Sequence, residues 1–340
     1  MNYIVKDENA IYYECGYSSD NALFLKLGSE AFFITDSRYE IEAKESVNGA
    51  TVIIDRDLYG QANKLIKNSN IKKLKYDPKE WTIWAFEKLK EDALKIKFKA
   101  VPDFSHKKRI VKSSEELLLL KKAVTLGAKA FDEFAEIIKK HGFGQDEKML
   151  TFMAKAMLSQ KGKYELSFDP IVAVNANAAK PHALPTDTIL SKKDLLLVDA
   201  GLKYKRYCSD RTRTISARKD FEFGYKQRFK KKKIQKAYDL VLKAHDNAIE
   251  KARSGMKAKK IDALTRDIIE KGGMGKYYVH STGHGVGLDI HEMPYISSKS
   301  DTIVEDGMVY TIEPGIYVPN EFGIRIEDMV AMQSGRAVVL

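Results

Sequence analysis

The second part of the chain repeats one order of expected elements, and this repeat is what most limits its fold. Each copy has two helices, marked by apolar residues at helical spacing, followed by strands rich in apolar and β-branched residues. The expected helices are residues 114–140, 145–161, 228–253 and 258–272, and the expected strands are residues 167–175, 194–200, 204–216, 277–283, 307–313 and 324–332. Two such units in succession predict an α+β domain with duplicated helix-helix-strand halves.

A different pattern precedes this repeat. Strands are expected within residues 21–35 and at 51–54, 72–76 and 95–101, and helices at 39–46, 58–67 and 81–94. Such alternation predicts a smaller α/β domain with a mixed sheet. Residues 102–111 then form a basic linker, and Ser113 with Glu116 gives the pattern of a capping box that starts the next helix. We expect one domain at residues 1–110 and a second at residues 111–340.

Acidic residues occupy matching places in the two halves of the second domain. Asp199 and Asp210 fall on consecutive strands joined by a short turn. Glu313 and Glu327 have the same arrangement in the later half. Because facing residues of paired strands can point to one side of a sheet, the four carboxylates converge on one cleft if the halves pack face to face. His284 adds a nitrogen atom from the segment before the last hairpin.

This set of side chains favours divalent metal ions. Carboxylates crowded into one site without a metal would be forced to take up protons. Four carboxylates and one imidazole exceed the needs of one ion with an open position. They suit two ions that share bridging carboxylates, lie about 3.5–4 Å apart and lower the pKa of a shared water. Oxygen-rich ligands favour Mn²⁺, with Co²⁺ or Zn²⁺ as alternatives. The sequence therefore predicts a hydrolase whose nucleophile is a metal-bound hydroxide.

Length and composition narrow the remaining classes of protein. The chain has 340 residues, 44% of them hydrophobic, which is enough for two folded domains. No stretch approaches the roughly 18 consecutive apolar residues of a membrane span, and the N-terminus lacks the pattern of a secretory signal. The net charge of +11 comes mostly from scattered lysines, without a nucleic-acid-binding motif. The two cysteines cannot form a disulfide framework. We expect a cytoplasmic protein that binds neither membranes nor nucleic acid.

Several short segments of residues 110–335 match a known family. They are Pro181-His182, Val198-Asp199-Ala200-Gly201, Ser209-Asp210-Arg211-Thr212-Arg213-Thr214, Gly283-His284-Gly285-Val286-Gly287, His291-Glu292-Met293-Pro294, Glu313-Pro314-Gly315 and Arg325-Ile326-Glu327-Asp328. Together they resemble the pita-bread metallopeptidases, which include Xaa-Pro aminopeptidase, Xaa-Pro dipeptidase (prolidase), methionine aminopeptidase and the non-peptidase creatinase. The segment Thr35-Asp36-Ser37-Arg38-Tyr39 resembles the creatinase-type domain that precedes the catalytic domain in the proline-specific members.

The resemblance implies a role for each acidic residue and for His284. Asp199 would chelate one metal, and Asp210 and Glu327 would bridge both. His284 and Glu313 would hold the second metal. Glu313 would also accept the proton of the attacking water and pass it to the leaving proline nitrogen. The set Asp199, Asp210, His284, Glu313 and Glu327 is thus the expected metal site.

The resemblance also implies substrate contacts. His182 and His291 match two active-site histidines that contact the substrate and stabilise the tetrahedral intermediate. His280 and Arg325 match positions of the substrate pocket. Taken singly, these residues have plainer interpretations, because His182 fits an ordinary surface loop and Arg325 could pair with a neighbouring carboxylate across strands.

The resemblance leaves the preferred substrate and the assembly to be decided. Dipeptide-specific relatives often place an arginine after the His-Glu-x-Pro segment, where this chain has Tyr295, and the nearby Lys299 would be a less selective partner for a carboxylate. We therefore expect an Xaa-Pro aminopeptidase, with Xaa-Pro dipeptidase as the alternative and a catalytically inactive pita-bread binding protein as an alternative of another class. The family also implies a homodimer that acts on peptides with proline in second position.

Overall fold

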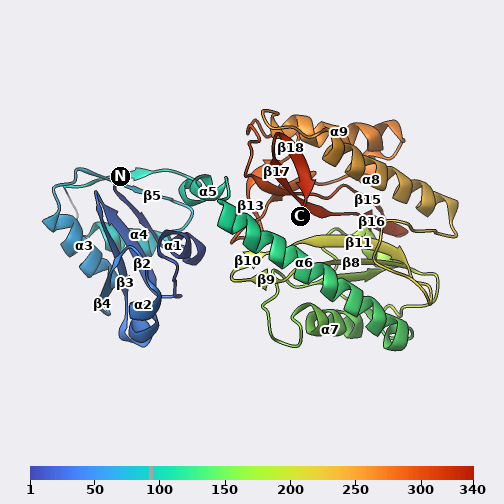
Figure 1. The fold of residues 1–340 in the computed structure, drawn as a ribbon, viewed down its shortest axis with the longest axis horizontal. Coiled ribbons are helices and arrows are strands. Elements are labelled where there is room, and N and C mark those ends of the chain that lie inside the picture. The colour runs from blue at the N-terminus through green and yellow to red at the C-terminus, as the bar shows by residue number, and fades with distance from the viewer. Residues whose placement is uncertain (92–94) are drawn as a thin grey trace. The chain divides into compact units, whose positions relative to one another are not determined.

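The structure, a computed structural model, describes residues 1–91 and 95–340 of the chain. The described residues form two compact units, Met1–Arg109 and Ile110–Leu340 (Figure 1). The first unit is a helix-covered mixed sheet, and the second combines two pairs of long helices with smaller sheets. The expected two-domain architecture, a smaller α/β domain followed by an α+β domain, is confirmed.

A mixed sheet forms the centre of the first unit. Its strands are β1 (Tyr3–Val5), β2 (Ala22–Leu27), β3 (Glu30–Thr35), β4 (Thr51–Ile54), β5 (Lys73–Tyr76) and β6 (Lys97–Ala100), arranged in the order β4-β3-β2-β1-β5-β6. Alternate side chains of β2 pack on opposite faces. Leu23 and Leu25 join the core under helices α3 (Leu58–Asn68) and α4 (Ile83–Lys90). Phe24 joins the core under α1 (Glu8–Cys15) and α2 (Glu40–Ser46).

Three predictions for the first unit need correction or limits. The expected linker at residues 102–111 contains a short helix, α5 (Phe104–Arg109). The Phe104 side chain packs into the core, and the backbone N–H of Phe104 donates to the Asp77 carboxylate. The strand β1 and the helix α1 were not expected, since both are short and lie in a segment of mixed polarity. The expected helix at residues 81–94 appears as α4, and residues 92–94 lie outside the described residues.

The first half of the second unit follows the expected order closely. Helix α6 (Ser114–Ile137) begins with the predicted capping box, in which Ser113 and Glu116 exchange hydrogen bonds. Helix α7 (Glu147–Leu158) follows, and then a sheet of β7 (Ile171–Val174), β8 (Leu195–Ala200) and β11 (Arg211–Ser216) in the order β11-β8-β7. The two helices and this sheet share one apolar core.

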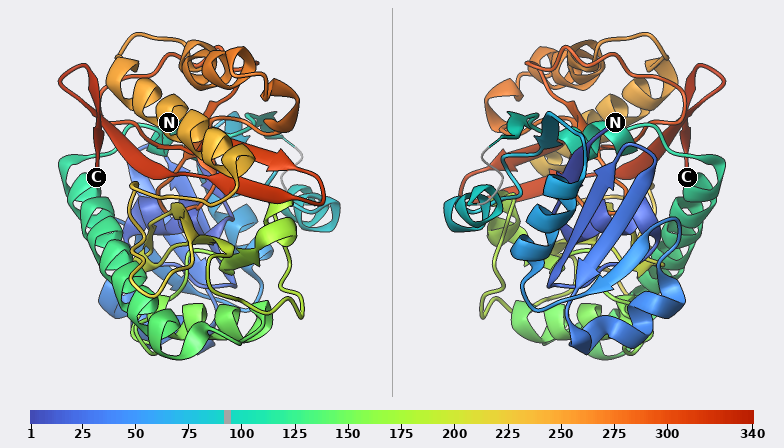
Figure 2. Two further views of the ribbon diagram at one scale, coloured as in Figure 1. Left: turned by 90° about the vertical axis from the view of Figure 1, so that its right-hand side faces the viewer. Right: turned by 90° about the vertical axis from the view of Figure 1, so that its left-hand side faces the viewer.

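The second half repeats the scheme with a larger sheet. Helices α8 (Lys232–Lys251) and α9 (Ala258–Lys271) precede a five-stranded sheet in the order β13-β12-β14-β17-β18. Its strands are β12 (Gly283–Gly285), β13 (Glu292–Ile296), β14 (Val309–Ile312), β17 (Asp328–Gln333) and β18 (Arg336–Val339). The expected strand at residues 277–283 is wrong over most of its length, because Gly275–Tyr277 is a 3₁₀ turn and pairing begins only at Gly283. Figure 2 (left) shows α8 and α9 on one side of the sheets of this unit and α6 and α7 on the other.

A small hairpin is inserted into the paired strands of each half. In the first half it is β9 (Lys203–Tyr204) with β10 (Tyr207–Cys208), turning at Lys205 and Arg206, both with positive φ. In the second half it is β15 (Gly315–Val318) with β16 (Phe322–Arg325). The strands expected at residues 204–216 and 324–332 are therefore each broken. Both breaks coincide with acidic residues, Asp210 and Glu327, which lie just outside the resumed strands.

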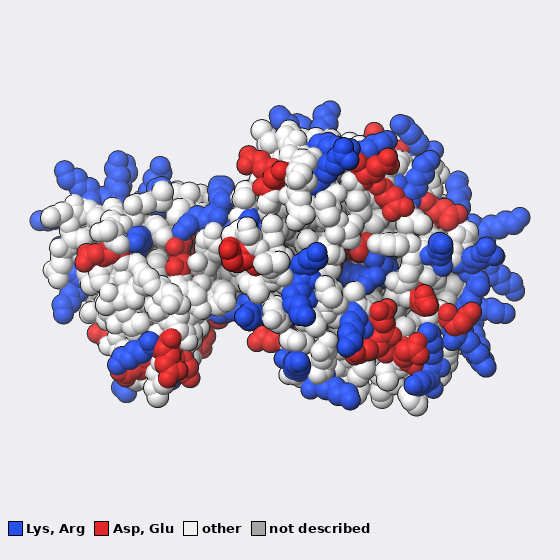
Figure 3. Space-filling view, in the orientation of Figure 1, with Lys and Arg blue, Asp and Glu red and all other residues white. Residues whose placement is uncertain are grey.

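The molecular surface is rich in charge of both signs. On the face drawn in Figure 3, lysine and arginine side chains are spread over the surface, with aspartate and glutamate side chains among them. Among the described helices, none combines the length and apolar character that a membrane crossing requires.

Candidate metal centre

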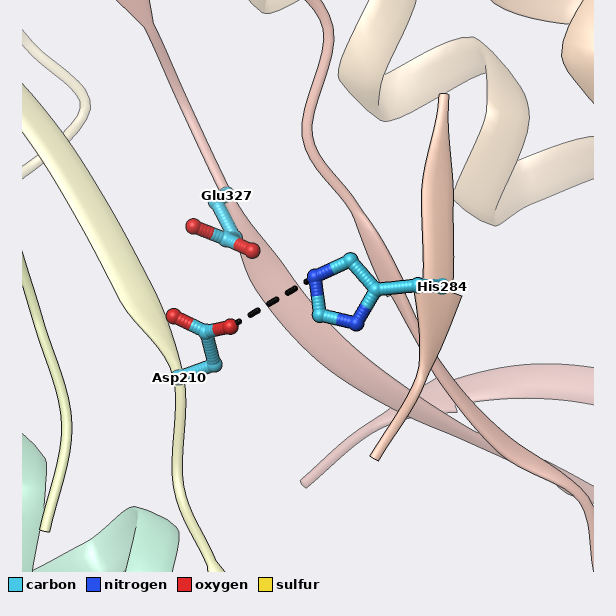
Figure 4. A group of neighbouring side chains, drawn as sticks. All are labelled: Asp210, His284 and Glu327. Carbon is cyan, nitrogen blue, oxygen red and sulfur yellow. Dashed lines mark ion pairs between the residues drawn. The ribbon is translucent and has the colours of Figure 1, made fainter. Parts of the chain in front are cut away.

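The structure brings all five residues of the expected metal site together in the second unit. Figure 4 shows Asp210, His284 and Glu327 pointing toward one another from three different strands or their ends. One ligand atom from each of these three lies within 4.8 Å of the others. Glu313 is close as well, since its Oε1 lies 3.4 Å from Nε2 of His284. Asp199, Asp210, His284, Glu313 and Glu327 also line a single cleft.

The two halves of the unit meet at these carboxylates. Asp199 lies in β8 opposite Thr212 of β11, and the amide of Glu327 donates to the carbonyl of Thr212 at 3.1 Å. The Thr212 hydroxyl donates to Oε2 of Glu327 at 2.6 Å. Thr212 therefore links Glu327, from the second half, to the strand that follows Asp210 in the first half.

His284 is held as a neutral imidazole with one nitrogen directed at the acids. Its Nδ1 lies 3.1 Å from the carbonyl of Gly285, which can only accept, so Nδ1 carries the proton. Burial and the neighbouring His291 lower the pKa of His284 to about 3. The contacts of Nε2 with Asp210, at 3.7 Å, and with Glu313 are thus not ion pairs at neutral pH, although their distances would allow it. A lone pair on Nε2 is the form that a metal ligand requires.

Burial and the neighbouring carboxylates disfavour the ionised form of three of these carboxyl groups. Burial, followed by the charges of Glu327 and Asp199, raises the pKa of Asp210 well above its usual range. Burial raises the pKa of Glu313 to about 8, with a further contribution from Asp199. The pKa of Glu327 is raised for the same kinds of reason. Without a cation, these carboxyl groups tend to stay protonated. A bound cation offsets the repulsion between their charges and favours the ionised form, which is the form that ligates a metal.

Asp199 provides a further sign that a cation belongs here. Its Oδ2 accepts from Arg325 at 2.5 Å, while its Oδ1 is buried and has no hydrogen-bond partner among the residues that the structure describes. A buried carboxylate oxygen without a donor is costly unless another positive group meets it. The residues present therefore fit divalent metal ions.

Arg325 starts a chain of hydrogen bonds along the cleft wall. It is buried and donates to Asp199, to Thr212, to the carbonyl of Pro181 and, at 2.7 Å, to the Tyr317 hydroxyl. Tyr317 in turn donates to Nε2 of His280 at 2.9 Å, because Nδ1 of His280 already donates to the carbonyl of Ser281. Arg325 and His280 both line the cleft, and their expected contacts with substrate stay predictions.

The two expected catalytic histidines are exposed at the same cleft. His182 and His291 both line it, and the His291 ring lies 4.2 Å from that of His284, between centroids. Burial and His182 lower the pKa of His291. His291 is carried by the segment before Glu292, whose carboxylate lies 2.5 Å from Lys112 with both side chains 1% exposed. A buried ion pair thus holds the segment that presents His291.

Sequence reasoning missed a second buried network beside the metal ligands. Arg213 Nη2 donates to Asp328, the residue after Glu327, at 2.7 Å, and Nη1 donates to the carbonyl of Glu327 at 2.6 Å. Tyr225 and His245 also contact Asp328, from a loop and from α8. The available signal was weak: Arg213 is a charged residue in the middle of a β-strand and alternates with Thr212 and Thr214. Tyr317 carried no comparable signal.

The cleft has a volume of about 550 Å³, within the range of roughly 300–1,000 Å³ that is typical of small-molecule sites. Apolar side chains form much of its wall, including Phe168, Pro170, Ile171, Leu184 and Ile290. Tyr295 lines the cleft, whereas Lys299 is exposed and is not among the lining residues. Lys299, the carboxylate partner that the sequence offered near Tyr295, therefore does not line the cleft.

Comparison with known proteins places this arrangement in a family. The model of metallopeptidase family M24 matches residues 119–334, and the model of the creatinase/prolidase N-terminal domain matches residues 2–111. The chain belongs to metallopeptidase family M24. The resemblance to pita-bread metallopeptidases inferred from the short segments is confirmed, and with it the expectation of a metal-dependent hydrolase fold.

Individual relatives and solved structures match over nearly the whole chain. An Xaa-Pro dipeptidase from Pyrococcus furiosus is 32% identical over 338 residues, which cover 98% of this chain and 91% of the relative. The structure of an Xaa-Pro dipeptidase from Bacillus anthracis has a TM-score of 0.90 at 30% identity, over 99% of this chain and 92% of the other. An X-Pro aminopeptidase from Thermotoga maritima has a TM-score of 0.87 at 27% identity, over 99% and 94%.

Proposed function

We propose that this M24 protein is an Xaa-Pro dipeptidase, in place of the Xaa-Pro aminopeptidase that the sequence alone favoured. The relative from Pyrococcus furiosus, 32% identical, and the structure from Bacillus anthracis, 30% identical, are both Xaa-Pro dipeptidases. The X-Pro aminopeptidase structure from Thermotoga maritima is 27% identical. The absence of an arginine at Tyr295, which favoured the aminopeptidase, is a weaker argument because other cleft residues can bind a carboxylate.

One observation carries the catalytic part of the proposal. Two buried carboxyl groups, of Asp210 and Glu327, and the partly buried one of Glu313 have raised pKa values and lie near the unprotonated nitrogen of a neutral histidine in a cleft. We assign Asp199, Asp210, His284, Glu313 and Glu327 as the ligands of two divalent ions, with Asp210 and Glu327 shared. When bound, such ions supply a water of lowered pKa and polarise the substrate carbonyl.

The remaining steps belong to residues of the chain. Glu313, at the cleft, accepts a proton from the attacking water and delivers it to the leaving nitrogen. That delivery is essential because the nitrogen of an Xaa-Pro bond carries no hydrogen and leaves poorly unless protonated. His182 and His291, both exposed at the cleft, donate hydrogen bonds to the carbonyl oxygen as negative charge develops on it.

Arg325 acts through Asp199 rather than on the substrate in this proposal. Its guanidinium binds Oδ2 of Asp199, which leaves Oδ1 available to a metal ion. It also fixes Tyr317 and, through it, the ring of His280. The arrangement holds the Asp199 carboxylate in one orientation.

We further propose Mn²⁺ as the native metal, with Co²⁺ or Zn²⁺ as alternatives, because oxygen donors outnumber the single imidazole. A homodimer in the cytoplasm stays a prediction. Analytical ultracentrifugation at micromolar concentration tests the assembly, and a monomer there would contradict it.

The decisive experiment compares hydrolysis of Ala-Pro with hydrolysis of Ala-Pro-Ala by the full chain in Mn²⁺. Cleavage of the dipeptide alone supports the dipeptidase, and equal cleavage of both substrates supports the aminopeptidase instead. No cleavage of either, together with no measurable binding of Mn²⁺, Co²⁺ or Zn²⁺, would leave the inactive binding protein as the better description. The Asp210→Asn variant serves as the inactive control.

A further inference from the structure

One wall of the cleft carries an ion pair that the proposed chemistry does not use. Lys155 of α7 and Asp169 both line the cleft, and Nζ of Lys155 lies 2.8 Å from Oδ1 of Asp169. Thr151, one helical turn before Lys155, lines the same cleft. This side of α7 therefore faces the space in which a substrate would lie.

Lys155 is the exposed basic side chain of the cleft, and a ligand can therefore reach it. Among the described residues that line the cleft, the lysines and arginines are Lys155 and Arg325. Arg325 is 4% exposed and makes four hydrogen bonds to protein acceptors. Lys155, by contrast, has 43% of its side chain exposed. Of these two side chains, Lys155 is therefore the one available to a negatively charged group in the cleft.

The ion pair with Asp169 does not prevent Lys155 from binding a negatively charged ligand. The Asp169 side chain is 86% exposed, so the pair is largely hydrated. Exposed ion pairs of this kind contribute only about 0–1 kcal/mol. A ligand carboxylate can therefore share or replace Asp169 as the partner of the Lys155 ammonium at little cost, while Asp169 remains a competing anion.

We propose that Lys155 binds the C-terminal carboxylate of the substrate and that Asp169 weakens this binding by competing for the same ammonium. The assignment rests on the proposed Xaa-Pro dipeptidase activity and deepens it. It gives the cleft a carboxylate partner in spite of Tyr295 at the position where dipeptide-specific relatives often have arginine. An ammonium is a less directional partner than a guanidinium, so the preference for dipeptides is graded rather than absolute.

The test compares Ala-Pro with its C-terminal amide as substrates of the Mn²⁺-loaded full chain. One charge-assisted hydrogen bond predicts a preference of the wild type for the free acid of roughly 10- to 100-fold in kcat/KM. In Lys155→Met the preference falls to about 1–3-fold, through a higher KM for the acid, and hydrolysis of the amide changes less than about 3-fold. Lys155→Arg keeps the preference. In Asp169→Asn the preference for the acid exceeds that of the wild type, and an unchanged preference contradicts the competing role of Asp169.

Lys148→Met is the matched control. Lys148 lies on the same helix in an exposed pair with Asp187 at 2.7 Å, and it does not line the cleft. This variant should leave both rates unchanged. An acid preference that survives in Lys155→Met, or a wild type without any acid preference, overturns the assignment while leaving Xaa-Pro hydrolysis intact. A wild type that cleaves neither substrate overturns the proposed function and the assignment with it.

Discussion

Replacing Arg213 with methionine tests how strongly the buried network beside Glu327 supports the catalytic unit. The change keeps an unbranched apolar stem but removes the guanidinium that lies 2.7 Å from Asp328, where the two side chains are 1% and 11% exposed. Burial alone would raise the pKa of Asp328, yet Arg213 and His245 hold it below its usual range. Removing one partner of a buried pair costs about 3–5 kcal/mol. At roughly 2–4 °C per kcal/mol for a protein of this size, the Tm should fall by roughly 6–20 °C.

Thermal unfolding followed by circular dichroism in EDTA measures this effect without a contribution from metal release. Lys257→Met is the control, because its pair with Asp301 at 3.0 Å is 51% and 63% exposed and should contribute less than about 1 kcal/mol. The double variant Arg213→Met, Asp328→Asn should recover part of the loss, since no charge is then left buried alone. If Arg213→Met unfolds within about 2 °C of Lys257→Met, the reasoning from burial is refuted.

Further outcomes follow from the metal centre. Asp210→Asn should lower Mn²⁺ content and turnover together, measured by elemental analysis and dipeptide hydrolysis, and full turnover would contradict a bridging role. Without metal, the pKa of Glu313 in the folded chain is about 8 against a usual 4.5, so its contribution to stability is present at low pH and lost as the pH rises through about 8. Urea unfolding in EDTA should therefore show lower stability near pH 8.5 than near pH 6, and added Mn²⁺ should abolish that difference. His182→Ala and His291→Ala should each lower kcat by about 10²–10³-fold with Mn²⁺ content unchanged, as expected for donors to a developing oxyanion. Loss of metal in either variant would point to ligation instead.

The order of elements could be predicted because hydrophobic spacing and caps are local signals. The capping box at Ser113 placed the start of α6, and the apolar run ending at Asp199 placed β8. Failures concern elements that tertiary pairing creates. The strand β12 is only Gly283–Gly285, and its pairing with β13 and β14 is set by neighbours distant in sequence. Glycine-rich segments carry no strand signal of their own.

The candidate metal ligands could be predicted from the sequence, but the partners that orient side chains in the cleft could not. The four acids could be found because they fall at matching places in the two halves, and His284 because it precedes the last of these segments; all five line one cleft. The orientation of Asp199 depends on Arg325, 126 residues away, and that of His280 depends on Tyr317. Such partners are chosen by packing across the two halves, which residue spacing does not encode. Lys155 was missed for the same reason, since nothing local distinguishes it from other helix lysines.

The division of the acids between two halves has a consequence for how the chain matures. Asp199 and Asp210 arrive with the half that leaves the ribosome first, and His284, Glu313 and Glu327 arrive with the later half. Under the proposed ligand set, the two shared carboxylates come from opposite halves, so a nascent or truncated polypeptide cannot assemble the dinuclear centre. Hydrolytic activity therefore requires that both halves have been synthesised and have folded against each other.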